Sequence, residues 1–332
     1  MKSLFRTFFM PLCVVIEVCI IVILAIYIYR TKFTSNVLGT ATVAPLRKEY
    51  LMFPIDSPLT YFYEPKPNIT EEEQPAWLGY TATYTINGDS LNERYDYAVD
   101  KPSDTYRIIA LGDSFTFGHY VNTSDNWPEQ LEDMLNANPP CQDGRRYEVI
   151  NLGERGYDVQ YIAYRYRNRG KKYQPDLIIW HESGSGFSRI KEILHPMVER
   201  ISQELSPEEQ SMVQERPNTD PALWRALDEM RKKYSEESIF EQVYASWIDF
   251  FETRANVPVL ITTFSYILPQ DNAKLKYWTR NQTNTWVYNG IPNIYELGGG
   301  LPDGHPNTKG HEIIARSTLQ YLLGSRVIHC LK

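Results

Sequence analysis

Residues 107–118, RIIALGDSFTFG, decide the fold of this chain. An apolar run stops abruptly at Gly112, Asp113 and Ser114. A short apolar run that ends at a turn predicts a strand buried on both faces, here over 105–111. A Gly-Asp-Ser turn is by itself ordinary turn chemistry. The sequence around it must therefore decide whether Ser114 is a nucleophile or only the polar turn after a strand.

Strand-like and helix-like segments alternate from about residue 104 onward. Alternation without short hairpins predicts a parallel, doubly wound α/β sheet of five strands. A helical insertion over 188–256 separates the third strand from the fourth, where it either borders the crevice as a lid or partner surface or only thickens one side. The predicted strands are 105–111, 147–152, 176–181, 257–264 and 292–297.

Polar residues follow the carboxyl ends of these predicted strands, which meet at one crevice in an open parallel sheet. A serine hydroxyl needs a neighbouring base before it can attack, and His305 could serve Ser114 in that role. Asp303, two residues earlier, could orient the imidazole and stabilise its charged form. The backbone N–H groups of Ser114 and Gly156 are candidate donors to a developing oxyanion.

Asp113, His181 and Glu182 are candidate pocket residues at the same sheet edge. The alternative for His181 and Glu182 is that they are polar residues that finish a strand. Cys141 and Cys330 could form a disulfide outside the cell, although their spacing does not require one. No clustered His/Cys pattern indicates a metal, and no cofactor is expected.

The N-terminus differs from the rest of the chain. Between Arg6 and Arg30 lies an apolar stretch whose one charge is Glu17, long enough to span a bilayer as a helix. It is followed by Arg-Thr-Lys rather than by a small-residue cleavage site, which predicts an uncleaved anchor. We expect a short cytoplasmic tail at 1–6, a transmembrane anchor at 7–29 and an extracytoplasmic body.

Residues 30–103 are predicted to be a juxtamembrane segment that docks on the main domain, 104–332, because it carries many aromatic residues. Its stretch YTATYTINGDSL predicts a strand and hairpin with a turn at Asn87-Gly88-Asp89.

The charge of the body narrows its partners. The 332-residue chain has a formal charge of −7, and without residues 1–32 the remainder has 30 basic and 40 acidic residues. An acidic body argues against nucleic acid as a partner, because phosphates need a basic face.

The motifs ALGDSFTFG and DGHPNTKGHEIIA, with VINLGERGYD and YQPDLIIW between them, resemble those of the GDSL or SGNH hydrolases over roughly 105–323. The resemblance implies a flavodoxin-like three-layer α/β/α sandwich and hydrolysis or transfer of small acyl groups, often acetyl groups on carbohydrate. It implies Ser114 as nucleophile, His305 as base, Asp303 as the third triad member and Gly156 as an oxyanion donor.

One position departs from that family's pattern. Its third block usually ends in Gly-x-Asn-Asp, and Ser185 stands where the Asn would complete the oxyanion hole. Losing such a donor costs about 100- to 1,000-fold in turnover. Three outcomes stay open: Ser185 donates, the insertion supplies a donor, or the site is weakened.

Three functions follow from this pattern. The first is an anchored serine esterase that removes small acyl groups, with carbohydrate esters among the candidate substrates. The second is an O-acyltransferase on a cell-envelope glycan, which needs a multi-spanning membrane partner to supply the acyl donor. The third is a catalytically weakened glycan-binding or scaffold protein on the same fold.

Overall fold

The computed structural model describes most of the chain downstream of residue 47. The predicted anchor at 7–29 and Ser185 lie outside the described residues. No helix in the described part is both long enough and apolar enough to cross a membrane. The described residues are 48–184, 186–215, 220–325 and 327–330.

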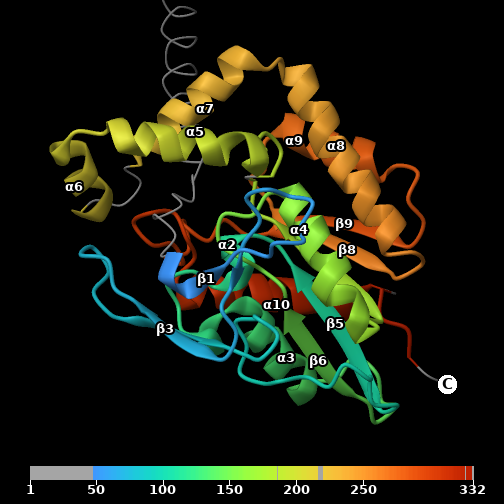
Figure 1. The fold of residues 1–332 in the computed structure, drawn as a ribbon. Coiled ribbons are helices and arrows are strands. Elements are labelled where there is room, and N and C mark those ends of the chain that lie inside the picture. Colours follow the sequence, from blue (N-terminus) through green and yellow to red (C-terminus); the bar gives the residue numbers. More distant parts are fainter. Residues whose placement is uncertain (1–47, 185, 216–219, 326, 331–332) are drawn as a thin grey trace, which may run out of the picture. The chain divides into compact units, whose positions relative to one another are not determined.

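Five parallel strands form the central sheet in the order β6-β5-β7-β8-β9 (Figure 1). The chain passes from β5 to β6 on one side and then returns to β7 on the other, so the order switches at β5. Ligands of doubly wound sheets bind beyond the carboxyl ends of the strands at such a switch. The strands are β5 (Thr105–Leu111), β6 (Arg146–Asn151), β7 (Leu177–Glu182), β8 (Val259–Phe264) and β9 (Thr285–Ile291).

Helices cover both faces of the sheet, which makes three layers (Figure 1). Along β5, Ile108 and Ala110 pack with one helical layer, while Ile109 and Leu111 pack with the other. This alternation explains why the strand is apolar at successive positions. One layer contains α3 (Trp127–Ala137) and α10 (Thr308–Gly324), and the other contains α4 (Val159–Arg165), α8 (Glu236–Thr253) and α9 (Pro269–Thr279).

The predicted fifth strand, 292–297, was wrong. That stretch is a turn, and the fifth strand is β9, at 285–291. β9 is an edge strand, and six of its seven residues, from Thr285 to Gly290, are at least partly exposed. Its sequence therefore lacks the continuous apolar run that marks a central strand.

Between β7 and β8 the chain forms α5 (Lys191–Glu204), α6 (Pro207–Glu215), α7 (Pro221–Lys233) and α8. Three polar residues begin these helices. Ser206 and Glu209 exchange side-chain-to-backbone hydrogen bonds, as in a capping box. Asp220 accepts from the N–H of Leu223 to begin α7, and Ser235 begins α8 in the same way.

The segment upstream of β5 packs onto the sheet domain through buried ion pairs. It contains two antiparallel pairs, β1 with β2 and β3 with β4. Arg155, after β6, binds Glu71 of β3 through two hydrogen bonds, and Arg165 of α4 binds Glu64 of β2. The pairs are β1 (Leu51–Met52) with β2 (Glu64–Pro65), and β3 (Ile69–Glu73) with β4 (Ala82–Ile86).

The predicted hairpin over 80–91 is different in the structure. Residues 82–86 form β4, as expected, but its strand partner is the preceding β3, in the stretch ITEEE. After the turn at Asn87 only a single bridge joins Ile86 to Asn92. Three consecutive glutamates hid β3, because acidic residues are uncommon in strands.

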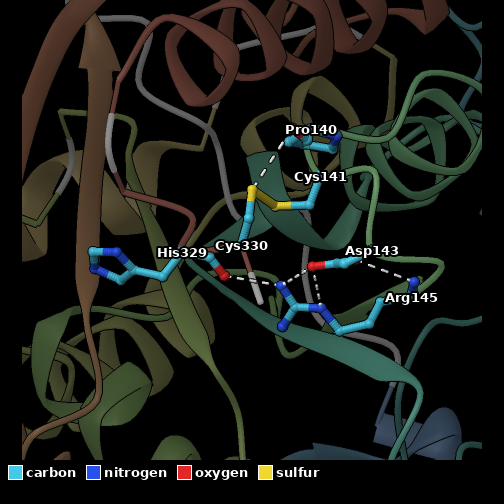
Figure 2. Close-up of a disulfide and its surroundings, with 6 residues drawn as sticks. All are labelled: Pro140, Cys141, Asp143, Arg145, His329 and Cys330. Atoms are coloured by element: carbon cyan, nitrogen blue, oxygen red, sulfur yellow. Dashed lines mark hydrogen bonds and ion pairs between the residues drawn. A yellow bond between two sulfur atoms is a disulfide. The ribbon is translucent and has the colours of Figure 1, made fainter. Parts of the chain in front are cut away.

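A disulfide joins Cys141, in the loop before β6, to Cys330, beyond α10 (Figure 2). Arg145 lies beside it, donating hydrogen bonds to the Asp143 carboxylate and to the His329 carbonyl. The C-terminal tail is thus fastened to the amino end of the sheet by a covalent bond and by a charge-assisted contact.

Candidate active site

Ser114, Asp303 and His305 form one hydrogen-bonded chain. The Nε2 atom of His305 lies 2.9 Å from Ser114 Oγ, and its Nδ1 atom lies 2.5 Å from Asp303 Oδ2. The other Asp303 oxygen accepts the backbone N–H of His305 at 3.0 Å. All three side chains are buried. The structure therefore brings Ser114 together with Asp303 and His305, which lie 189 and 191 positions later in the sequence.

The charges in this chain determine where the protons lie. Burial opposes ionisation of Asp303, but its contacts with His305 outweigh that effect and lower the pKa of Asp303. Burial likewise opposes a charged His305, but Asp303 outweighs it and raises the pKa of His305 above 6.5. An ionised Asp303 accepts a hydrogen bond from Nδ1–H of neutral His305, which leaves the Nε2 lone pair to accept the hydrogen bond, and later the proton, of the Ser114 hydroxyl.

Close backbone packing positions Ser114. A Cβ at Gly112 would lie 2.1 Å from Thr116 Oγ1, and one at Gly153 would lie 2.3 Å from the backbone N of Phe117. Only glycine fits at either position, so the loops after β5 and β6 press against the short helix α2 (Ser114–Phe117).

Asp113 organises the turn that carries Ser114. Its side chain accepts the N–H of Phe115, and its carbonyl accepts those of Thr116 and Phe117. The first N–H groups of a helix have no intrahelical acceptor. The Ser114 N–H is the one in this turn that Asp113 does not take. Asp113 also accepts the hydroxyl of Ser183, after β7, at 2.5 Å.

Of the other two predicted oxyanion donors, the structure describes Gly156 but not Ser185. Gly156 is half-buried in the turn before α4 with φ of 73°, a left-handed conformation that favours glycine. Ser185 lies outside the described residues, so the predicted third donor stays a prediction.

His181 and Glu182 are both buried, with separate roles. His181 Nδ1 lies 3.1 Å from Thr262 Oγ1, and burial lowers the pKa of His181 to about 4. Glu182 accepts the N–H groups of Gly184 and Gly186, so its carboxylate holds the loop after β7. Burial, aided by Asp113, raises the pKa of Glu182 to about 7.

A second histidine, which the sequence did not single out, adjoins the candidate triad. The His119 ring lies edge-on to that of His305, with centroids 4.8 Å apart, and its Nε2 lies 3.0 Å from Glu73 Oε2. Glu73 lies in turn 3.8 Å from Arg155. Burial would raise the pKa of Glu73, but His119 and Arg155 outweigh it and lower that pKa to about 2. The only signal for His119 in the sequence was its position, directly after the stretch 107–118 that carries Ser114.

No metal site accompanies these groups in the described residues. They contain no set of three or more His, Cys, Asp or Glu side chains that could hold a metal ion.

Comparisons with known proteins find solved structures of similar fold. No protein-family model and no curated protein matches the chain. The chain is similar in fold to SGNH/GDSL esterases. The psychrotrophic esterase EstA from Pseudoalteromonas sp. matches with a TM-score of 0.41 and 11% identity, over 65% of this chain and 96% of that one.

Two further solved structures show the same level of similarity. AlinE4, an SGNH-hydrolase family esterase, has a TM-score of 0.34 and 16% identity over 68% of this chain and 98% of its own. The two-domain esterase CEX, active on acetylated mannans, has a TM-score of 0.38 and 16% identity over 66% of this chain, which covers 49% of CEX.

Proposed function

We propose that this protein is a serine ester hydrolase that removes small acyl groups through a Ser114–His305–Asp303 triad. The observation that carries the proposal is the continuous chain of hydrogen bonds from Asp303 through both nitrogens of His305 to Ser114 Oγ. A nucleophile bonded to a base, with the base oriented by a third group, is the arrangement that acyl transfer needs.

In the first half-reaction, Ser114 Oγ attacks the acyl carbon while its proton passes to His305 Nε2. The Ser114 N–H is a candidate donor to the oxyanion, with Gly156 and Ser185 as the others. His305 then returns the proton to the leaving alcohol oxygen as its bond to the acyl carbon breaks. Water, deprotonated by His305, attacks the acyl-enzyme, which releases a carboxylic acid and restores the Ser114 hydroxyl.

The finer assignments extend this proposal. We infer that residues 7–29 anchor the protein in a membrane with its body outside the cytoplasm, an environment in which a disulfide such as Cys141–Cys330 persists. Acetyl esters of carbohydrate are the proposed substrates, on the basis of the sequence motifs shared with the SGNH hydrolases.

The test uses the full chain in detergent, a fluorophosphonate probe and an aryl acetate. The wild type should be labelled at Ser114 and should hydrolyse the ester, whereas Ser114→Ala should lose both. Ser265→Ala, which changes an exposed serine just beyond β8, is the matched control and should keep both. A wild type that folds but neither labels nor turns over would contradict the proposal.

A further inference from the structure

A cavity of about 270 Å³ lies between the start of α4, the loop that leads into α5, and α8. It contains none of the three triad residues. Its polar lining includes Gln160, Arg189, Gln242 and Ser246, while Val159 and Val243 are among the apolar residues of its wall. Ligand pockets for drug-sized molecules start at about 300 Å³, so this volume suits a single sugar-sized group.

Arg189 is the positively charged residue of the cavity lining. Among the described residues, none lies within ion-pair or hydrogen-bonding distance of its half-buried guanidinium. Burial therefore lowers the pKa of Arg189, and the charges of Asp113 and Glu182 only partly offset that effect. A guanidinium held in this way favours an anionic partner.

The two carboxylates that line the cavity are already engaged. Asp158 accepts the N–H of Tyr161, where it begins α4, and the N–H of Lys191. Asp249 forms an ion pair with Arg167. Neither is paired with Arg189, so both carboxylates of the lining have other partners and the guanidinium is left for a ligand.

Lys191 adds a second cation beside Arg189. Its Nζ lies 5.9 Å from the centre of the Tyr63 ring. Burial lowers the pKa of Lys191 to about 8, and the nearby Arg189 contributes to that lowering. An anion bound by Arg189 would also reduce the repulsion between the two charges.

The loop after β7 links the cavity to the turn that carries the candidate nucleophile. Asp113, which precedes Ser114, is the carboxylate whose charge stabilises Arg189 most. The loop after β7 begins at Ser183, bonded to Asp113, and its Gly186 packs so closely on Val159 that a Cβ there would lie 3.1 Å from Val159 Cγ2. One loop thus runs from the candidate active site to the cavity wall.

We propose that this cavity is a subsite for a carboxylate-bearing, sugar-sized group of the ester substrate, with Arg189 binding the carboxylate. Substrate binding at this subsite rests on the proposed esterase function. The planar guanidinium matches a carboxylate with two parallel hydrogen bonds. The amides of Gln160 and Gln242 and the hydroxyl of Ser246 match sugar hydroxyls, and the apolar residues match the C–H face of a ring.

The kinetic test compares two acetate esters that differ only at C6, an O-acetylated methyl glucuronide with a carboxylate there and the corresponding methyl glucoside with a hydroxymethyl group. With the full chain in detergent, we expect the wild type to have the lower KM for the glucuronide. In Arg189→Gln the preference for the glucuronide, expressed as a ratio of kcat/KM values, should fall about 10- to 100-fold, the range for one charge-assisted contact. Arg316→Gln, which removes an exposed cation on α10 in the other helical layer, should leave the ratio as it is.

A binding test separates the subsite from the chemistry. Ser114→Ala should bind methyl glucuronide in calorimetry, and the Ser114→Ala/Arg189→Gln double variant should not. Binding without any turnover in the wild type would refute the esterase but support the subsite. An unchanged preference together with unchanged binding would overturn the subsite, as would Arg189-dependent binding of inorganic phosphate without binding of the glucuronide. Equal unfolding temperatures of the variants would exclude misfolding.

Discussion

The two ends of the central sheet both carry buried charged residues, but they differ in how fully those charges are paired. At the amino end, Arg107 binds Glu148 and the Tyr173 carbonyl, and Asp176 binds Lys101. At the carboxyl end, Ser114 and His305 hold a proton that can move, and Arg189 has no ion-pair partner among the described residues.

This difference separates stability from chemistry within one sheet. Satisfied ion pairs and a disulfide hold the amino end in one arrangement, whereas the carboxyl end keeps groups available for a ligand. Substitutions of Ser114, His305 or Arg189 should therefore change rates, and those at the amino end should change the free energy of unfolding.

The largest effect is expected at the carboxyl end, from His305→Ala. Without a base, Ser114 is a weak nucleophile, so kcat on an aryl acetate should fall about 10⁶-fold. The unfolding temperature, measured by circular dichroism, should change little in comparison.

Asp303→Asn is a milder change in the same hydrogen-bonded chain and is the comparison for His305→Ala. It keeps the shape of the side chain but favours the wrong tautomer of His305, and kcat should fall about 10⁴-fold. Equal small losses in both variants would show that His305 is not a base.

The intermediate effect is expected at the amino end, from the double variant Cys141→Ser/Cys330→Ser. The disulfide closes a loop with a sequence separation of 189, so its loss should lower the free energy of unfolding by about 2–5 kcal/mol. Urea unfolding followed by tryptophan fluorescence measures this change, while kcat/KM on the aryl acetate should stay within about twofold.

Reduction of the wild type should reproduce the double variant, and reduction of the double variant should have no further effect. A large loss of activity on reduction, without loss of stability, would contradict the assignment of stability to the amino end and of chemistry to the carboxyl end.

The smallest effect is expected in the pH profile of Glu73→Gln. Catalysis needs neutral His305, so kcat/KM should rise with pH through the raised pKa of that residue. The negative charge of Glu73 helps to raise that pKa, so its removal should move the rise to lower pH. The measurement is kcat/KM between pH 5 and 9.

Glu72→Gln is the matched control, because Glu72 is exposed on the opposite face of β3. Its profile should coincide with that of the wild type. A rise that moves to higher pH in Glu73→Gln would contradict the arrangement of charges described here.

The parts of the fold and of the candidate site that were predicted correctly are those whose signal lies in neighbouring residues of the sequence. β5 was predicted with the bounds that the structure has, because both of its faces are buried and its sequence is continuously apolar. Asp303 and His305 were identified although the strand before them was misplaced, because their spacing in the chain carries its own chemical meaning. The bond from Ser114 to His305 follows from the parallel sheet, which brings loops from different strands to one edge.

What the sequence did not predict involves pairing at long range. The glutamates of β3 suggested solvent exposure, but Glu71 is buried against Arg155, 84 residues later, and Glu73 lies against His119. No local spacing encodes such pairs. The same holds for Arg189, whose significance lies in the partners that the surrounding described residues do not provide.

The ion pairs between the upstream segment and the sheet domain determine where this protein can be cut. A truncation at residue 104 follows the domain limit that the sequence suggests, but it would remove both Glu64 and Glu71. Arg155 and Arg165 would then lose the carboxylates that neutralise them in the interior, and the loop that carries Gly156 would lose its brace. The smallest self-sufficient unit therefore includes the strands from β1 onward, and recombinant fragments for crystallisation should begin upstream of Leu51.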